Sequence, residues 1–362
     1  MSAPVVAVNG RFLTMTLTGV QRYAHEILPR LAASLDARLR VIVPPRRVLD
    51  ADDPALGAIA TTSTWHGVHG HYWEQVVLPR LVRELGARAL WSPCSWGPIA
   101  VRRHVPVVHD IAPFVHGGHV TPMYWVLARL LTPPLVRRAA FVATPSSGVR
   151  TDLVEQFRLD PDRVRTIPPG VGAPFDSWPL DDLERRPRRY CVMVGAHDTR
   201  KNPGFLLDLW PDVRKRTGLE LHLTYRSFVT TRRQPDLGSS KPDGVVLHAD
   251  PTDEKLADLY ANALCLLWPS HYEGYGFPLL EATAVGTPFL ATDVGAAREL
   301  AVNPELQILP LERQIWVERV EALARDGVGR LARQSAERAR TQTWEAAAAQ
   351  TARLLDDLAR SD

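Results

Sequence analysis

The sequence predicts two α/β domains in tandem, each built around a parallel β-sheet. The chain has 362 residues, which suffices for two domains of about 150 to 180 residues each. Short apolar runs alternate with longer amphipathic segments in both halves, which is typical of repeated βαβ units. Between the halves, residues 168–187 contain five prolines and two glycines. Such a density interrupts regular structure and marks a linker.

The strands expected in the first half are short apolar runs, at 5–9, 40–43, 89–91, 106–109 and 141–144. Helices are expected near 20–35 and at 73–85, 123–137 and 147–157. In the second half, strands are expected at 190–194, 219–224, 245–248, 264–268 and 288–291, with helices at 205–217, 253–262, 277–285 and 344–359. The expected domains are 1–172, a hinge at 173–188, 189–342, and a last helical segment at 343–362. Because open parallel sheets bind ligands at the carboxyl ends of their strands, a cleft between two such ends is the expected site.

The composition is that of an ordinary soluble protein, with 45% hydrophobic and 23% charged residues. We expect no exported leader, no membrane span and free thiols, which indicates a cytoplasmic protein. The net charge is +3, yet residues 1–180 hold 19 Arg and no Lys against 13 acidic residues. This excess favours an anionic membrane surface or a phosphorylated acceptor, with peripheral association at the inner face of the membrane. An ordinary solvated surface explains it equally simply and is preferred.

The most informative segment runs from Trp268 to Ala282. Its order of residue types predicts a buried strand, a turn with Gly274 and Gly276, and a helix beginning near Phe277. Such a turn presents backbone N–H groups and a helix N-terminus to an anion. Glu273 in the turn and Glu281 in the helix could both accept hydrogen bonds from sugar or ribose hydroxyls. Taken singly, each glutamate is explained as a helix cap or a surface residue.

Three further loops follow predicted strands. Arg200 and Lys201 lie after the first strand of the second half, where they are placed to neutralise a diphosphate. His109 follows a strand of the first half and is accompanied by Asp110, which could orient its ring. Gly19 lies between the first strand and its helix, at a helix N-terminus. Each has a simpler explanation as a solvated loop, a satisfied polar group or an ordinary turn.

Together these segments resemble the glycosyltransferases of family 4, also called glycosyl transferases group 1, which are retaining enzymes of the two-domain GT-B fold. The segment Glu273–Glu281 with Gly286-Thr287-Pro288 resembles the family's E-x7-E signature and its trailing G-x-P. The loop Gly195–Asn202 resembles the family's Arg-Lys-Asn loop, His109-Asp110 its strand-end pair, and Gly19–Tyr23 its G-x-x-R-Y turn. Lesser matches include Trp73-Glu74-Gln75 and Trp344 before the last helix.

The resemblance implies a role for each of these residues. Glu281 would bind the nucleotide ribose and Glu273 the donor sugar. The backbone of Gly274, Tyr275, Gly276 and Phe277 would hold sugar hydroxyls and phosphate. Lys201, with Arg200, would grip the donor phosphates, His109 would contact the donor sugar, and Gly19 would approach the diphosphate. The last helix would cross back to the first domain.

The resemblance also has limits. The family usually has a glycine where Tyr225-Arg226-Ser227 stands, so contacts of that loop are not carried over. The loop Val115–His119 is unlike the family pattern, so the identity of the acceptor is not carried over either.

Other site types match less well. Asp160-Pro161-Asp162 has the form of a metal-binding D-x-D, but its place between a helix and a strand predicts a turn or cap. His66, His69, His71, His116 and His119 match no closed metal site and are expected as loop histidines on a polar surface. Dinucleotide and phosphate-loop fingerprints are absent from the sequence, and its basic residues do not interleave with aromatics as a nucleic-acid surface would.

The predicted function is therefore metal-independent transfer of a hexose, with retention, from a nucleoside-diphosphate sugar to a hydroxyl of a glycan, lipid-linked or small-molecule acceptor. No cofactor beyond the donor substrate and no nucleic-acid partner are expected. Mannose from GDP-mannose is the first choice of donor, because His109-Asp110 and the Lys201 loop look most like bacterial mannosyltransferases. A UDP-hexose and a deoxysugar are the alternative donors. The alternatives are a GT-B-fold epimerase or phosphorylase, or a non-catalytic scaffold subunit.

Overall fold

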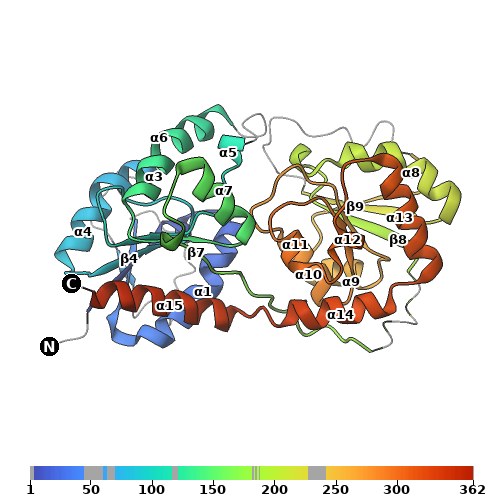
Figure 1. The fold of residues 1–362 in the computed structure, drawn as a ribbon. Helices are drawn as coiled ribbons and strands as arrows, with labels where there is room; N and C mark the ends of the chain where they lie inside the picture. The colour runs from blue at the N-terminus through green and yellow to red at the C-terminus, as the bar shows by residue number, and fades with distance from the viewer. Residues whose placement is uncertain are drawn as a thin grey trace. The chain divides into compact units, whose positions relative to one another are not determined.

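The computed structural model describes residues 4–44, 60–62, 70–115, 121–181, 183, 186, 188–226 and 242–361. The chain forms two compact units (Figure 1). Unit 1 comprises residues 1–111, 123–170 and 343–362, and unit 2 comprises residues 112–122 and 171–342. The last segment of the chain is thus part of unit 1.

Unit 1 is built on a parallel five-stranded sheet with the order β3-β2-β1-β4-β5. Its strands are β1 (Val6–Asn9), β2 (Leu39–Val43), β3 (Ala60–Thr62), β4 (Ala89–Ser92) and β5 (His104–Pro106). A second parallel pair joins β6 (Val142–Thr144) to β7 (Val164–Thr166). β5 begins two residues earlier and ends three residues earlier than the strand expected at 106–109. Beyond Pro106, Val107 N still donates to Ser92 O of β4 at 2.8 Å, whereas Val108 N donates to Ala143 O of β6 at 2.8 Å.

The helices of unit 1 are α1 (Gly19–Leu35), α3 (Gly70–Tyr72), α4 (Leu78–Glu84), α6 (Pro122–Arg138), α7 (Ser147–Phe157) and α15 (Trp344–Arg360). Between α3 and α4, residues Trp73–Val77 form a π-helical turn. One extra residue in the turn widens the helix locally, a distortion found mostly near functional sites. The helix predicted at 73–85 is therefore longer and less regular than expected.

Helix α15 packs along α1 (Figure 1). Its buried residues recur at helical spacing, which gives it one apolar face. At its start, the Trp344 ring lies 5.9 Å from the Tyr23 ring of α1, measured between centroids. Tyr23 in turn donates its hydroxyl hydrogen to Ile167 O at 3.2 Å. The final helix thereby closes the hydrophobic core of unit 1.

Unit 2 repeats the same strand order, β10-β9-β8-β11-β12, again parallel throughout. Its strands are β8 (Tyr190–Val194), β9 (Glu220–Tyr225), β10 (Val245–Ala249), β11 (Leu266–Trp268) and β12 (Phe289–Ala291). Its helices are α5 (Ala112–Val115), α8 (Pro203–Thr217), α9 (Asp253–Ala261), α10 (Phe277–Ala284), α11 (Ala297–Leu300), α12 (Pro304–Gln307), α13 (Arg313–Asp326) and α14 (Gly329–Arg340). The five strands and helices α8, α9 and α10 lie within two residues of their predicted bounds, and no bounds were predicted for the other helices of this unit.

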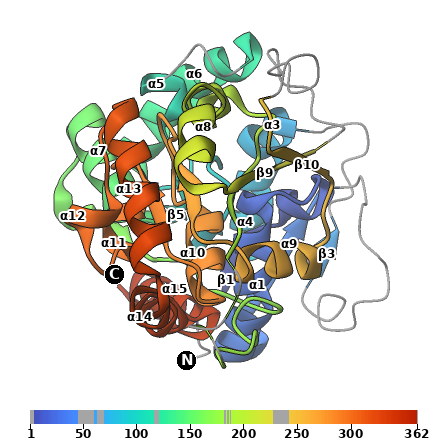
Figure 2. The same ribbon diagram turned by 90° about the vertical axis from the view of Figure 1, so that its right-hand side faces the viewer.

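Helices α8 and α13 lie side by side in unit 2 (Figures 1 and 2). They bury Trp210 and Trp316 in one apolar cluster with β8, β9 and β11. A second cluster places α10 and the end of α14 against the other side of these strands. The sheet is therefore covered on both faces, as parallel sheets require.

The shared strand order fixes where each unit offers a ligand site. In both sheets the chain runs outward in one direction from the central strand and later returns to its other side, which makes a topological switch point. The switch points lie after β1 and β4 in unit 1 and after β8 and β11 in unit 2. Separately, no helix of the described part of the chain is long and apolar enough to cross a membrane.

Candidate functional site

The switch point of unit 2 is formed by the loops after β8 and β11. His271 N donates to Arg200 O at 2.9 Å, which ties the second loop to the first. The loop after β8 turns through a short 3-10 helix, Thr199–Lys201, capped by Asp198. The structure thus brings the two strongest sequence motifs together at one edge of one sheet.

Lys201 is the cation at the centre of this edge. Its Nζ lies 4.5 Å from the centroid of the Trp268 ring and 3.4 Å from Val194 O. Burial lowers the pKa of Lys201, although the nearby carboxylates of Glu273 and Glu281 oppose that effect. Lys201 makes no ion pair with any carboxylate in the described residues. Its ammonium therefore retains charge that an anionic ligand can neutralise.

Gly195 makes room for Lys201. Its φ of +79° is a conformation that favours glycine, and a Cβ there would lie 2.5 Å from Lys201 Nζ. The glycine at the end of β8 is consequently required both by the backbone and by the ammonium beside it.

Arg200 has a different role from its neighbour. Its guanidinium pairs with Asp198 at 3.0 Å and with Glu273 at 3.1 Å, and it also donates to Tyr272 O. Burial tends to raise the pKa of Asp198, but the charge of Arg200 outweighs it and the pKa is lowered. Because these bonds occupy the guanidinium, Arg200 holds Glu273 in place. Its expected contact with phosphate stays a prediction.

The two glutamates are buried beside this cation, each 7% exposed. Glu273 accepts from Ser270 Oγ at 2.9 Å, and Glu281 accepts from Tyr260 Oη at 3.4 Å. The residue that caps α10 is Gly276, with φ of +93°. The simpler interpretation of Glu273 as a helix cap is therefore wrong. Buried carboxylates cost free energy unless they are hydrogen-bonded, and these bonds supply that compensation, so the ligand-binding role of the two glutamates stays a prediction.

Trp268 is a site residue that the motif did not reveal. It ends β11, is 1% exposed, and its Nε1 has no hydrogen-bond partner among the described residues. The same nitrogen lies 3.9 Å from where a Cβ of Gly276 would stand. The indole therefore touches both Lys201 and the glycine turn. Its only sequence signal was its position directly before the motif.

The turn Gly274–Phe277 is held by backbone and side chain. Tyr275 is buried, which raises the pKa of its phenol, and its hydroxyl donates to Gln342 Oε1. Tyr275 O accepts from Ala296 N at 2.9 Å. The Tyr275 side chain thus braces the turn, and a ligand would meet its backbone.

A cavity of about 460 Å³ opens beside this site. It shares Ser270 and His271 with the loop after β11, and its other walls are Thr292, Asp293, Val294, Arg298 and residues 308–311. Lys201, Glu273 and Glu281 do not line it. The charged loops therefore define the site better than the cavity does.

His109 and Gly19 lie in unit 1. His109 is 6% exposed, and its Nε2 donates to Pro93 O at 2.6 Å. Burial lowers the pKa of His109 to about 4, so the ring is neutral at pH 7 and its Nδ1 is an acceptor. Gly19 is the first residue of α1, where Gln21 Oε1 accepts from Thr18 N at 3.2 Å. Asp110 as an orienting partner of His109 stays a prediction.

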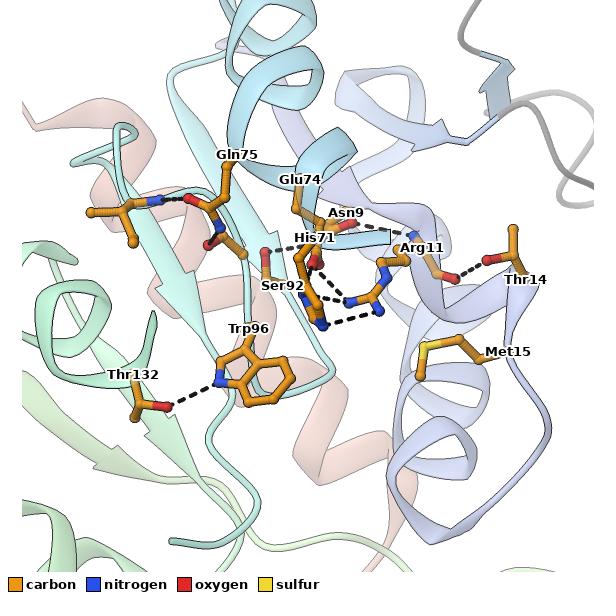
Figure 3. A network of polar contacts seen from close by, with 12 residues as sticks. Asn9, Arg11, Thr14, Met15, His71, Glu74, Gln75, Ser92, Trp96 and Thr132 are labelled. Atoms are coloured by element: carbon orange, nitrogen blue, oxygen red, sulfur yellow. Dashed lines mark hydrogen bonds and ion pairs between the residues drawn. The ribbon is translucent and has the colours of Figure 1, made fainter. Parts of the chain in front are cut away.

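Sequence reasoning missed a second polar cluster, at the switch point of unit 1 (Figure 3). There Glu74 is 1% exposed and is bonded by Asn9, Arg11 and His71. The interpretation of His71 as a loop histidine on a polar surface is therefore wrong. The signals were present in Trp73-Glu74-Gln75 and in Asn9 at a strand end, but nothing in the sequence linked them.

Asp160 accepts from Asp162 N at 2.9 Å and caps a short 3-10 helix, as its position predicted. Across the described ranges, His, Cys, Asp and Glu form no group of three that could hold a metal ion.

Comparison with known proteins places this geometry in a family. Residues 17–173 match the model of "Glycosyltransferase Family 4", and residues 188–326 match "Glycosyl transferases group 1". The O-antigen chain mannosyltransferase RfbU of Salmonella typhimurium is 25% identical over 222 residues, 60% of this chain and 59% of RfbU. The chain thus spans about three fifths of that relative's length.

A second relative is matched over more of its length. The O-antigen chain mannosyltransferase B of Escherichia coli is 24% identical over 311 residues, 78% of this chain and 81% of the relative. Among solved structures, sucrose-phosphate synthase from Thermosynechococcus elongatus superposes with a TM-score of 0.67 at 17% identity, over 99% of both chains.

These matches define a GT-B fold. Since the two family models together take in most of both units, the chain belongs to the glycosyl transferases of group 1, family 4.

Proposed function

We propose that the protein transfers a hexose from a nucleoside-diphosphate sugar to an acceptor hydroxyl, with retention at the anomeric carbon. The observation that carries the proposal is the half-buried ammonium of Lys201 at the switch point of unit 2, which makes no ion pair among the described residues and lies beside the turn that begins α10. A cation, a helix N-terminus and two buried carboxylates together suit a diphosphate joined to two sets of hydroxyls. The family membership of the chain supports this assignment.

In the proposed reaction the bond between the anomeric carbon and the diphosphate oxygen breaks. The acceptor oxygen forms a new bond to that carbon on the same face, and its proton passes to the departing phosphate. Lys201 and the turn Gly274–Phe277 offset the charge that develops on the diphosphate, which is the main requirement of the site. Glu281 accepts from the ribose hydroxyls, and Glu273, fixed by Arg200, accepts from the donor sugar.

His109 would contribute as a neutral acceptor. With its Nε2 hydrogen committed to Pro93 O, the remaining nitrogen accepts a hydrogen bond from a sugar hydroxyl. Its lowered pKa excludes a role as a general acid near pH 7. It would orient the sugar, as Glu273 does.

GDP-mannose is the proposed donor, supported by two relatives named as mannosyltransferases. The test is a thermal-shift panel of GDP, UDP and ADP with their sugars, because a ligand that binds only the folded state raises the unfolding temperature. We expect the largest rise with GDP and GDP-mannose. NMR of the released glycoside then reports the anomeric configuration, and an inverted product would overturn retention.

Metal independence is a separate part of the proposal. Lys201 supplies the positive charge that a divalent ion gives in other transferases. Turnover should survive excess EDTA unchanged, whereas recovery only on adding Mg²⁺ or Mn²⁺ would overturn this part.

The other functions separate by product. An epimerase would return an isomerised sugar nucleotide, a phosphorylase would need inorganic phosphate, and a scaffold subunit would release no nucleoside diphosphate by itself. Release of GDP and formation of a glycoside by the purified chain select the transferase.

Association with an anionic membrane surface is proposed for helix α6. It contains no acidic residue, exposes Met123, Trp125 and Leu130, and holds Arg129 over the Trp125 ring at 4.5 Å. Aromatic and apolar side chains beside arginines suit the lipid interface. Sedimentation with vesicles of phosphatidylglycerol, but not of phosphatidylcholine alone, is expected, and Met123→Asp with Leu130→Asp should abolish it. Equal sedimentation of the double variant would refute the assignment.

A further inference from the structure

A buried carboxylate organises the switch point of unit 1 (Figure 3). Glu74, in the π-helical turn, accepts from Asn9 Nδ2 at 2.8 Å, from Arg11 Nη1 at 2.7 Å and from His71 Nδ1 at 2.9 Å. Asn9 also donates to Ser92 Oγ at 3.3 Å, which joins the ends of β1 and β4. A carboxylate with a 2% exposed side chain needs such partners, so the network is held firmly.

The His71 ring lies between Glu74 and Arg11. With a hydrogen on Nδ1 it donates to Glu74, and its two ring nitrogens lie 3.2 Å from Arg11 Nη1 and 3.4 Å from Arg11 Nη2. Arg11 is therefore held by the carboxylate of Glu74 and by the ring of His71. A guanidinium has five N–H groups, and these contacts engage two of its nitrogens. The side chain of Arg11 is 18% exposed, so its other donors are accessible to a ligand.

Aromatic rings lie beside this cation. The His71 and Trp96 rings meet edge to face at 4.7 Å, and Tyr124, 37% exposed, lies 5.1 Å from Trp96. Trp96 Nε1 donates to Thr132 Oγ1 at 2.9 Å. The rings are thus fixed before any ligand arrives, which lowers the entropy cost of binding.

The loop that carries Trp96 is itself fixed by Gln75. Its Nε2 donates to Gly97 O at 2.9 Å, and its Oε1 accepts from Ile99 N at 3.1 Å. Neighbouring residues of one π-helical turn therefore set both halves of the cluster, Glu74 the cation and Gln75 the aromatic loop.

We propose that this cluster is the acceptor subsite and that it binds a neutral sugar ring, with Arg11 as the contact residue and Glu74 as its positioning residue. The inference rests on the proposed glycosyl transfer. The charge of Arg11 is balanced by Glu74, so the cluster offers directed donors without a net positive charge. That arrangement favours hydroxyls over phosphate, in contrast to Lys201. Rings beside a few fixed polar groups are typical of small-ligand sites.

The test uses the full chain with GDP present and ligand-observed saturation-transfer NMR. The probes are the methyl α-glycosides of mannose, glucose and galactose, and the 6-phosphates of mannose and glucose. We expect at least one neutral glycoside to bind better than either phosphate. Arg11→Met should weaken it about tenfold, the effect of losing about 1.4 kcal/mol. Arg30→Met, which removes an arginine paired with Glu26 and Glu345, is the matched control and should change nothing.

Glu74→Gln gives the sharper result. Losing the carboxylate leaves Arg11 uncompensated, so preference should shift about tenfold from the glycosides toward the 6-phosphates. A purely structural role for Glu74 would weaken all probes alike. If this buried variant does not fold, as judged by circular dichroism, the partly exposed Arg11→Met decides the question.

The outcomes separate the two proposals. Stabilisation by GDP without binding of any glycoside, or glycoside binding unchanged in Arg11→Met, overturns the acceptor subsite alone. Stronger binding of the 6-phosphates by the unmodified chain overturns the charge argument and with it the neutral acceptor. Absence of any shift with nucleoside diphosphates counts against the donor assignment instead.

Discussion

The two units share one strand topology, but the basic residues at their two switch points differ in how their charge is balanced. Both sheets have a central strand followed by a switch, and both put a basic residue just after it. In unit 2 the ammonium of Lys201 lies over an indole ring without an ion pair in the described chain. In unit 1 the guanidinium of Arg11 is paired with the buried Glu74 at 2.7 Å. The fold sets the place of a ligand, and the charge balance at that place sets its chemistry.

The difference supports the two proposals, a donor diphosphate bound by unit 2 and an uncharged acceptor bound by unit 1. An unpaired, partly desolvated cation gains most from an anion, because interactions are stronger where water is excluded. A cation whose charge is already balanced by a carboxylate orients the hydrogen bonds of a ligand more than it attracts the ligand. Four predictions separate these cases.

The largest effect is expected at Lys201. Lys201→Ala should reduce turnover about 100- to 1,000-fold, the usual result of removing one preorganised group that stabilises developing charge. It should also abolish stabilisation by nucleoside diphosphates. Lys255→Ala is the control, since Lys255 is exposed and pairs with Asp258 at 2.9 Å. Near-normal turnover of Lys201→Ala would remove the contrast between the units.

The next effect concerns pH and unit 1. His109 has a pKa of about 4 when folded and an ordinary value of 6.5. Between these values the unfolded chain binds a proton that the folded chain does not, so the free energy of unfolding falls as pH decreases from 6.5 to 4. In His109→Gln, this fall in the free energy of unfolding should be about 3 kcal/mol smaller. Urea titrations at pH 7 and pH 4.5 measure it; parallel losses in both proteins would contradict the buried neutral ring.

Asn9 tests the network of unit 1 without touching unit 2. Asn9→Ala removes donors to Glu74 and Ser92, and leaving a buried carboxylate short of one partner costs about 2 kcal/mol. Chemical denaturation should show this loss, while the temperature shift caused by GDP stays the same size. A smaller GDP shift would mean that the two switch points do not act separately.

The smallest effect compares two glycines of unit 2 with similar backbones. Gly195 and Gly218 have φ of +79° and +71°, but only a Cβ at Gly195 would meet Lys201. Replacing either by alanine should cost about 1 kcal/mol of stability. Gly195→Ala should in addition weaken nucleoside-diphosphate binding about tenfold, measured by calorimetry. Equal binding by both variants would show that the ammonium has room to move.

Much of unit 2 was predictable because its information is local. The strand, turn and helix around Glu273 and Glu281 occupy one continuous segment, and residue types at fixed offsets determined it. Strand and helix positions followed from apolar periodicity for the same reason. Strand β5 was misplaced because its end is set by a change of partner to β6, which no local pattern contains.

The network of unit 1 was not predictable, since its parts lie far apart in the chain. Asn9 is 65 residues from Glu74 in the chain and 83 residues from Ser92. The thiols of Cys191 and Cys265 likewise come within 3.6 Å across 74 residues. Which side chain balances Arg11 depends on how the turn that carries Trp73 and Glu74 packs on β1 and β4.

The sequence by itself therefore determined the fold class, the family resemblance and the residues that meet at the switch point of unit 2, because strand-end motifs carry their own geometry. The tertiary structure alone decided that Arg200 holds Glu273, that Trp268 underlies Lys201, and that Glu74 pairs with Arg11. The first two contacts join loops or strand ends of unit 2, and the third joins the end of β1 to a helical turn. In each, a buried or partly buried charged group is held by a residue far away in the chain.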